Sequence, residues 1–146
     1  MPDLDKFRLI LHDRKLKATP QRLAVHKAMI ALGHASADTV AEYIRKNTDV
    51  RISEASVYNT LNQLTRMGLY RYLLSSNNKL YFDINTRKHV HLYDRVNHEY
   101  RDICEDGAIE LIEKYFRGRR WRGYKFEGAE INLICRPSRK APAKTR

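Results

Sequence analysis

Histidine and aspartate side chains gather in the middle of the chain, where Asp83, His89, His91 and Asp102 follow one another. Along a β-strand successive side chains alternate between the two faces, so His89 and His91 would project from one face as two chelating imidazoles. Asp83 can fold back toward them across a short polar segment. Nitrogen and oxygen donors without a thiolate favour Fe²⁺, Mn²⁺ or Zn²⁺ over Ca²⁺ and over softer metals. Either histidine could instead ligate a haem iron axially, so the cluster predicts a metal or haem sensor.

The composition is that of a basic globular protein. The chain has 146 residues, of which 42% are hydrophobic and 31% charged, and its formal net charge is +11. This excess of positive charge suits a polyanionic partner, most simply nucleic acid, although a basic protein without such a partner has the same composition. No apolar run reaches the roughly 18 residues of a membrane span, and the N-terminus has no signal-peptide core, so we expect a cytoplasmic protein. Cys104 and Cys135 stand in apolar contexts without a Cys-x-x-Cys pattern, which predicts buried, reduced thiols.

The first half of the chain has the pattern of a winged helix-turn-helix. Apolar residues recur at helical spacing, and capping or terminating residues mark the ends of the helices, as at Thr19-Pro20 and Gly68. Two strands follow, joined by a polar turn. The predicted helices cover residues 4–14, 20–32, 37–46 and 54–67, and the predicted strands cover residues 69–74 and 79–84. Arg71 and Lys79 in this hairpin are candidates for contacts with DNA phosphates.

The second half predicts a small sheet with one helix. Strands are expected at residues 89–95, 100–104, 124–127 and 130–135, and a helix at residues 107–116. Such a unit is too small to bury a core of its own comfortably, which predicts pairing with a second copy. The fold class is therefore α+β, an N-terminal winged helix-turn-helix followed by a small α/β dimerisation domain. The expected parts are a DNA-binding domain (1–84), a hinge (85–88), a dimerisation and sensing domain (89–135) and a disordered basic tail (136–146).

The helix at residues 54–67 carries the best candidate for a DNA-reading face. Val57, Leu61 and Leu64 form its apolar stripe, which leaves short polar side chains on the opposite side. These are Ser56, Asn59, Thr60 and Gln63. Such groups can approach base edges in a major groove, whereas the alternative is a plain core helix with a solvated face. His12 and His26, on other helices, are expected on solvated faces.

Four motifs, taken in order, resemble the ferric uptake regulator (Fur) superfamily. They are Leu16–Arg22, Gly33–Asp38, Ser56–Leu64 and Gly68-Leu69, and the similarity runs from about residue 5 to residue 135. The resemblance implies a homodimer that regulates transcription from a palindromic operator in double-stranded DNA. Tyr81–Asp83 with His89–His91 resembles the peroxide-sensing branch, and the residue 57–65 run resembles the haem-responsive iron regulators. We therefore expect a metal- or haem-responsive repressor of iron homeostasis or peroxide stress genes, and not an enzyme.

The resemblance also implies the residues of each site. The implied metal ligands are His34, Asp83, His89, His91 and Asp102, and the implied DNA contacts are Lys17, Arg22, Ser53, Ser56, Tyr58 and Asn59. One divalent ion per subunit is expected, Fe²⁺ or Mn²⁺, with Zn²⁺ able to bind in vitro. Such an ion would lock the two halves at one angle and so set the spacing of two recognition helices in a dimer. Taken alone, His34 after the helix-ending Gly33 is more typical of a partner of the helix dipole.

Three departures from the family pattern matter. The structural zinc site of the family uses two Cys-x-x-Cys pairs, and Asp94 and Asn97 stand at the positions of the first pair, so no structural zinc is expected. Asn59 replaces a frequent arginine, which makes the usual operator sequence doubtful. The Cys-Pro haem motif of the haem-responsive branch is missing, which leaves His89 and His91 as the haem candidates.

Two other classes of protein share some of these features. Two histidines and a carboxylate are the minimal ligand set of a non-haem iron enzyme, although the sequence offers no signal of a substrate pocket or of a separate acid–base pair. A metal-independent DNA-binding module would keep the winged helix without using the histidines as ligands. Dependence of DNA binding on metal separates the three hypotheses.

Overall fold

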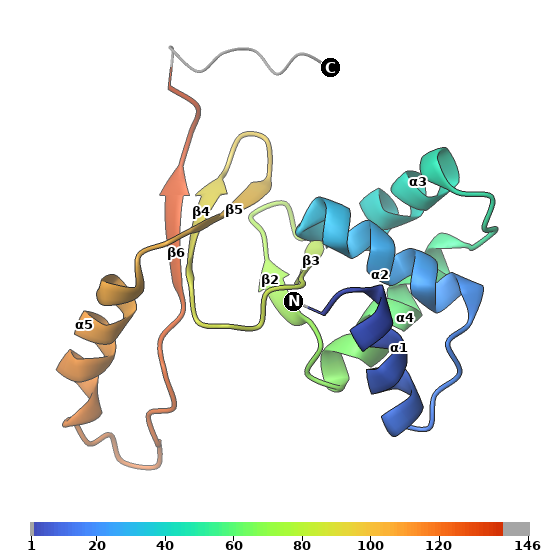
Figure 1. Cartoon of the computed structure of the whole chain (residues 1–146). Helices are drawn as coiled ribbons and strands as arrows, with labels where there is room; N and C mark the ends of the chain where they lie inside the picture. The colour runs from blue at the N-terminus through green and yellow to red at the C-terminus, as the bar shows by residue number, and fades with distance from the viewer. Residues whose placement is uncertain (1, 139–146) are drawn as a thin grey trace. The chain divides into compact units, whose positions relative to one another are not determined.

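The computed structural model describes residues 2–138, and Figure 1 shows its helices and strands. The chain divides into two compact units between Thr86 and Arg87. The first unit contains α1 (Leu4–Asp13), α2 (Pro20–Leu32), β1 (His34–Ser36), α3 (Ala37–Asn47), α4 (Glu54–Arg66), β2 (Arg71–Leu74) and β3 (Leu80–Asp83). The second contains β4 (Val90–Asp94), β5 (Glu99–Ile103), α5 (Asp106–Arg117) and β6 (Ile131–Cys135). The expected α+β class is confirmed.

Two expectations concern the C-terminal tail and membrane-spanning helices. The tail expected to be disordered lies outside the described residues from position 139 onward. Within residues 2–138, no helix combines the length and the apolar character needed to cross a bilayer.

Helices α2 and α4 begin where capping chemistry predicts. Thr19 caps α2 with its side-chain oxygen, and Pro20 takes the first helical position. Gly33 follows α2 with a φ of 71°, a conformation that residues with a side chain rarely adopt. Ser53 caps α4 in the same way as Thr19, since its Oγ accepts from the Ser56 N–H at 3.1 Å. Both helices therefore begin at the predicted residue.

The apolar faces of α1–α4 share one core with the sheet of the first unit. It includes Phe7, Leu11, Val25, Met29, Val40, Ile44, Val57, Leu61, Leu64, Tyr70 and Phe82. His26 lies inside this core with no exposed surface, so its predicted solvated position is wrong. Its ring stacks on Phe7, Nδ1 lies 2.7 Å from the Tyr70 hydroxyl, and Nε2 lies 2.8 Å from the Pro2 carbonyl oxygen. Because a carbonyl can only accept, Nε2 carries the proton and Nδ1 accepts from Tyr70, which satisfies the buried ring.

The sequence does not predict strand β1. The structure places residues 34–36 in a sheet with the strand order β1-β3-β2, whereas the strands predicted for the first half cover only residues 69–74 and 79–84. β1 pairs antiparallel with β3, and His34 stands opposite Asp83. Three residues are too few to show a strand period, so this pairing is decided by contacts far apart in the sequence.

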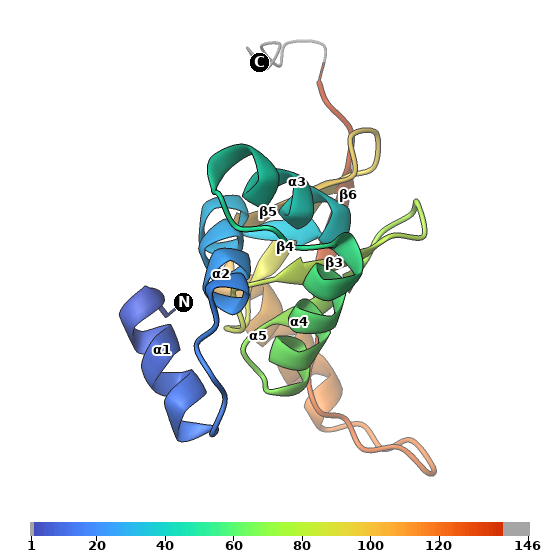
Figure 2. The same cartoon turned by 90° about the vertical axis from the view of Figure 1, so that its right-hand side faces the viewer.

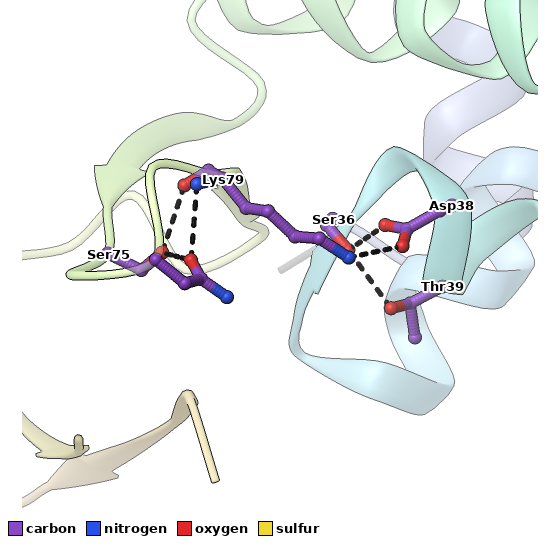
Figure 3. Close-up of polar contacts among 6 residues, drawn as sticks. Ser36, Asp38, Thr39, Ser75 and Lys79 are labelled. Atoms are coloured by element: carbon purple, nitrogen blue, oxygen red, sulfur yellow. Dashed lines mark hydrogen bonds and ion pairs between the residues drawn. The ribbon is translucent and has the colours of Figure 1, made fainter. Parts of the chain in front are cut away.

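The turn between β2 and β3 is the wing, and Figure 2 shows it projecting beyond the helices. From this turn the Lys79 side chain reaches the start of α3, where Nζ donates to Asp38 Oδ2 at 2.7 Å (Figure 3). Asp38 also accepts from the Ser36 hydroxyl, whose Oγ lies 3.0 Å from Thr39 Oγ1. Partial burial raises the pKa of Asp38, but hydrogen bonds from Lys79 and Ser36 outweigh it and hold that pKa below its usual value. Lys79 thus has a protein carboxylate as its partner, whereas the sequence suggests a phosphate.

In the second unit, β4 lies between β5 and β6. β4 and β5 are antiparallel, as the predicted hairpin requires, and β6 runs parallel to β4. The predicted strand at residues 124–127 is wrong, because Tyr124 makes only an isolated bridge with Trp121. β6 therefore has β4 as its neighbour, and not a hairpin partner. A connection that contains a helix, here α5, allows a strand to enter a sheet parallel to its neighbour.

The second unit leaves much of its apolar surface uncovered. Its buried apolar residues, within the described chain, are Val90, Tyr93, Tyr100 and Ile109. Exposed large apolar residues include Leu111, Tyr115, Leu133 and Ile134. Cys104 is also exposed, so its predicted burial is wrong, and Cys135 is partly exposed. An open apolar surface of this kind is typical of an interaction site.

Candidate metal centre and nucleic-acid interface

Three side chains of the second unit converge on one point. Nε2 of His89 lies 2.7 Å from Nε2 of His91 and 3.1 Å from Oδ1 of Asp102. Nε2 of His91 lies 3.6 Å from the same Asp102 oxygen. The sheet produces this arrangement, because His91 in β4 stands directly opposite Asp102 in β5. His89 joins them from the residue before β4.

The backbone decides which nitrogen of His89 carries the proton. Its Nδ1 lies 2.6 Å from the carbonyl oxygen of Arg87, and a carbonyl can only accept, so Nδ1 is protonated. In the neutral ring, Nε2 therefore presents its lone pair toward His91 and Asp102. A metal-bound histidine is oriented in this way, with its second nitrogen donating to a carbonyl or carboxylate.

The spacing of the three donors fits a divalent transition metal. Bonds of about 2.0–2.2 Å place neighbouring ligand atoms roughly 3 Å apart around an ion. The separations within the trio are 2.7, 3.1 and 3.6 Å, which bracket that value. Without a cation, the contact between the two Nε2 atoms requires a proton on one of them. A shared cation removes this requirement, and the Asp102 carboxylate would balance part of its charge.

A second pair of candidate ligands lies in the first unit. His34 in β1 and Asp83 in β3 are cross-strand neighbours, with Nε2 of His34 3.4 Å from Oδ1 of Asp83. The Asp83 carboxylate is buried, and it accepts from the Asn85 N–H at 2.8 Å. A buried carboxylate is stabilised by hydrogen bonds together with a positive charge, which an imidazolium or a metal ion supplies. The pair is smaller than the set of three or four protein ligands that is usual for a metal site.

The DNA contacts predicted on α4 lie at its start and on its outer face. Ser53 is exposed, and its hydroxyl donates to Ser56 Oγ at 2.9 Å while it caps the helix. Tyr58 is 42% exposed, and its ring meets Phe82 of β3 edge-on. Asn59 beside it is exposed. The ring of Tyr58 is thus supported by the core on one side while the other side remains accessible.

Arg22, one of the predicted DNA contacts, joins two parts of the first unit. Its Nη1 donates to the carbonyl oxygen of Lys17 at 2.8 Å, and its Nη2 donates to Gln63 Oε1 at 3.2 Å. The guanidinium therefore links the segment before α2 to the outer face of α4. Lys17 itself is exposed. Arg22 has a structural role that the sequence does not reveal.

The structure adds residues to this face that the sequence analysis does not single out. Arg14, Asn62 and Arg66 are the additions, and they line a hollow of about 470 Å³ together with Asn59 and Gln63, which the sequence already indicates. Tyr72 of β2 donates to Asn62 Oδ1 at 3.1 Å, so the wing orients a polar side chain of α4. Helical spacing relates Asn62 and Arg66 to Asn59, and this signal could have identified them. Arg14 and Tyr72 reach the face through tertiary contacts, for which the local sequence gives no signal.

The chain is similar to known proteins in its sequence profile and in its fold. The sequence profile of the ferric uptake regulator family matches residues 13–133. No curated protein matches the sequence significantly. The crystal structure of the Vibrio cholerae ferric uptake regulator is similar, with a TM-score of 0.74 and 22% identity over 89% of this chain and 98% of that chain.

Two further structures share the fold. A zinc-bound manganese uptake regulator has a TM-score of 0.71 and 16% identity, over 94% of this chain and 100% of that chain. The Campylobacter jejuni peroxide stress regulator has a TM-score of 0.63 and 24% identity, over 91% of this chain and 97% of that chain. Identities this low show a common fold.

Proposed function

The chain belongs to the ferric uptake regulator family, and from this premise we propose that it is a transcriptional repressor whose DNA binding is controlled by a divalent metal ion. The observation that carries the proposal is the trio of His89, His91 and Asp102, whose donor atoms lie within 3.6 Å of one another. The family relationship supports regulation and not catalysis. The family predicted from the four sequence motifs is confirmed by the match over residues 13–133.

We propose that one ion per subunit binds the trio together with His34 and Asp83. These five nitrogen and oxygen donors suit Fe²⁺ or Mn²⁺, and Zn²⁺ would bind in vitro. A structural relative that is a manganese uptake regulator with zinc bound supports a metal of this class. When bound, the ion would supply a link between residues on the two sides of the 85–88 segment. That link is what would make DNA affinity depend on metal.

We propose that the chain forms a homodimer and that the second unit provides the interface. Leu111 and Tyr115 lie one turn apart on α5 and are exposed, as are Leu133 and Ile134 on β6. The order β5-β4-β6 makes β6 an edge strand of its sheet within the described chain. An edge with exposed apolar side chains is a surface that a second copy can cover.

In such a dimer each α4 would enter a major groove of double-stranded DNA. The two grooves on one side of the duplex are about 34 Å apart, so a palindromic operator is expected. Ser53, Ser56, Tyr58 and Asn59 would approach the bases and phosphates from α4, and Lys17 would contact the backbone. We place Arg22 with them, because its contact with Gln63 puts it beside the outer face of α4.

Haem remains the second candidate ligand, and the geometry favours a metal ion over it. A haem iron needs one histidine nitrogen that points at the macrocycle with open space around it. Here the two Nε2 atoms of His89 and His91 are 2.7 Å apart, so haem could bind one ring only after the other has moved away. A small ion uses both rings as they stand.

The decisive experiment measures operator binding in one series with chelator, Mn²⁺, Fe²⁺ and haem. Candidate operators are first selected from random duplex DNA with the Mn²⁺-loaded protein. We expect chelator to weaken specific binding and Mn²⁺ or Fe²⁺ to restore it. The double variant His89→Ala/His91→Ala should lose the metal response, whereas His12→Ala, which changes an exposed histidine of α1, should keep it.

Each other outcome selects a different hypothesis. Specific binding that chelator leaves unchanged would support a metal-independent DNA-binding module. A haem absorption band that disappears in the double variant, with a matching loss of operator binding, would support haem control. Loss of operator binding after Fe²⁺ with peroxide would support peroxide sensing, and metal-dependent turnover without duplex binding would support an enzyme.

A further inference from the structure

Glu113 of α5 is a buried carboxylate that the proposed metal ligands do not include. Its exposed fraction is 5%. Oε1 accepts from Lys88 Nζ at 2.5 Å and from the Ala129 N–H at 3.3 Å, and Oε2 lies 3.5 Å from Nη2 of Arg117. The hydrogen bond from Lys88, and after it that from Ala129, lowers the pKa of Glu113. The carboxylate is therefore ionised at neutral pH and holds several donors at once.

Two of these donors stand where two strands enter the sheet. Val90 pairs with Ile131 at the start of the parallel β4–β6 ladder. Lys88 and Ala129 hold equivalent positions just before those residues, and Oε1 of Glu113 contacts both. A methyl group at Gly128 would approach the same oxygen to 3.2 Å, so the loop before β6 fits closely around the carboxylate.

The segment that contains Lys88 also carries a proposed metal ligand. His91 and Asp102 lie within strands, whereas His89 precedes β4 and lies outside its ladder. The ring of His89 is oriented by the Arg87 carbonyl at 2.6 Å. The position of His89 therefore depends on what fixes residues 87–89, and Lys88 in the middle of this segment is held by Glu113.

We propose that Glu113 is a positioning residue of the metal centre, which holds the Arg87–His89 segment through Lys88 and so places Nε2 of His89 beside His91 and Asp102. This inference rests on the proposed metal-dependent function. Ligands must be held to within about 0.5 Å for tight binding. Loss of a group that orients a ligand typically weakens a metal site by about 10–100-fold.

The test uses Co²⁺ as the probe, because its visible absorption bands report both binding and coordination geometry. The full-length protein is titrated with Co²⁺ in the wild-type form and as Glu113→Leu, Lys88→Met and the double variant. We expect each single variant to weaken Co²⁺ binding by about tenfold or more and to shift the bands. The double variant should be no weaker than the worse single variant, because the two residues act as one unit.

Matched controls separate positioning from general stability. Glu110→Leu and Lys114→Met change exposed residues of the same helix and should leave the Co²⁺ titration unchanged. Glu113→Gln keeps an oxygen that accepts from Lys88 and should recover part of the lost affinity. The melting temperature of each metal-free variant is measured in parallel, since a purely structural role would lower it without altering Co²⁺ affinity or bands.

The outcomes distinguish this inference from the proposed function. Wild-type affinity and bands in both Lys88→Met and Glu113→Leu would overturn the role of Glu113 and leave the metal centre standing. If Glu113→Leu does not fold, Lys88→Met decides alone, because it leaves the carboxylate with Arg117 and Ala129 as partners. A wild-type protein that binds no Co²⁺ would overturn the metal centre, and the role of Glu113 with it.

Discussion

At the scale of single residues, the metal proposal depends on where protons and charges lie. The Arg87 carbonyl fixes the proton of His89 on Nδ1, so Nε2 can act as a donor to a cation without any change of tautomer. To bind the same cation through Nε2, His91 must carry the proton of its neutral ring on Nδ1.

The first prediction concerns the carboxylate of the trio. Asp102→Asn keeps the shape of the side chain but removes the negative charge that lies 3.1 Å from His89 Nε2. We expect Mn²⁺ affinity to fall by about 100-fold or more, because a direct ligand should count for at least as much as a group that only orients one. Isothermal titration of the metal-free protein with Mn²⁺ measures this. Glu99→Gln on the same strand is the control, and equal losses in both variants would contradict the assignment.

The second prediction concerns His26. Desolvation by burial, which outweighs the hydrogen bond to Pro2, lowers the pKa of His26 below the ordinary value of 6.5. Between the lowered pKa and 6.5 the unfolded chain binds more protons than the folded protein, so the free energy of unfolding rises with pH there. This contribution is complete above the unfolded pKa and is lost as pH falls below it.

Urea denaturation between about pH 5 and pH 8 tests the role of His26. His26→Gln cannot titrate, so it should lower stability overall and remove a slope of at most about 1.4 kcal/mol per pH unit. The exposed His12→Gln variant should keep the wild-type slope. A slope that survives in His26→Gln would show that another group is responsible.

At the scale of elements, each functional side chain depends on a strand or helix end that holds it. The β1–β3 pairing brings His34 to Asp83, and the β4–β5 pairing brings His91 to Asp102. The start of α4 is held by Ser53, which is also a predicted DNA contact. Lys79 and Asp38 connect the wing to the start of α3.

The third prediction separates the two roles of Ser53. Ser53→Ala removes the cap on the Ser56 N–H and should destabilise the first unit by about 1 kcal/mol, whereas Ser53→Asn keeps a capping oxygen and should cost a few tenths. Both variants change the hydroxyl that would face DNA. Urea denaturation measures stability, and fluorescence anisotropy measures operator affinity. If Ser53 acts only as a cap, Ser53→Asn should bind the operator as the wild type does.

At the scale of the whole molecule, the second unit has more apolar surface than its own residues cover. Its described buried apolar residues come from β4, β5 and α5, while Leu133 and Ile134 of β6 remain exposed. The first unit, by contrast, has a continuous core that draws on helices α1–α4 and the sheet. A homodimer through the second unit would bury the exposed apolar side chains and give two DNA-reading helices to one assembly.

The fourth prediction follows from that surface. Leu111→Glu and Ile134→Glu should each raise the dimer dissociation constant by roughly 30-fold or more, the effect of losing an interface residue that contributes about 2 kcal/mol. Sedimentation velocity at several concentrations measures the association. Leu74→Glu, at an exposed apolar position in the first unit, is the matched control. A monomeric wild type, or two variants that dimerise normally, would refute the proposed interface.

The sequence by itself determined the features that depend on neighbours a few residues apart. Capping residues such as Thr19 and Ser53 fixed where α2 and α4 begin, and apolar spacing identified the inner face of α4. The His89-x-His91 spacing identified two of the three members of the trio, since strand alternation places such residues on one face. The family motifs supplied His34 and Asp102 as expectations.

The tertiary structure alone decided which distant residues meet. β1 is too short to be predicted, yet its pairing with β3 is what brings His34 to Asp83. His26 is buried because Pro2 and Tyr70 satisfy both ring nitrogens, and no local pattern shows that such partners exist. Glu113 lies one helical turn after the buried Ile109, but no local pattern shows that Lys88 and Ala129 supply donors to a carboxylate on that face. Periodicity and capping are local and therefore written in the sequence, whereas strand pairing and the burial of polar groups depend on partners that only folding brings together.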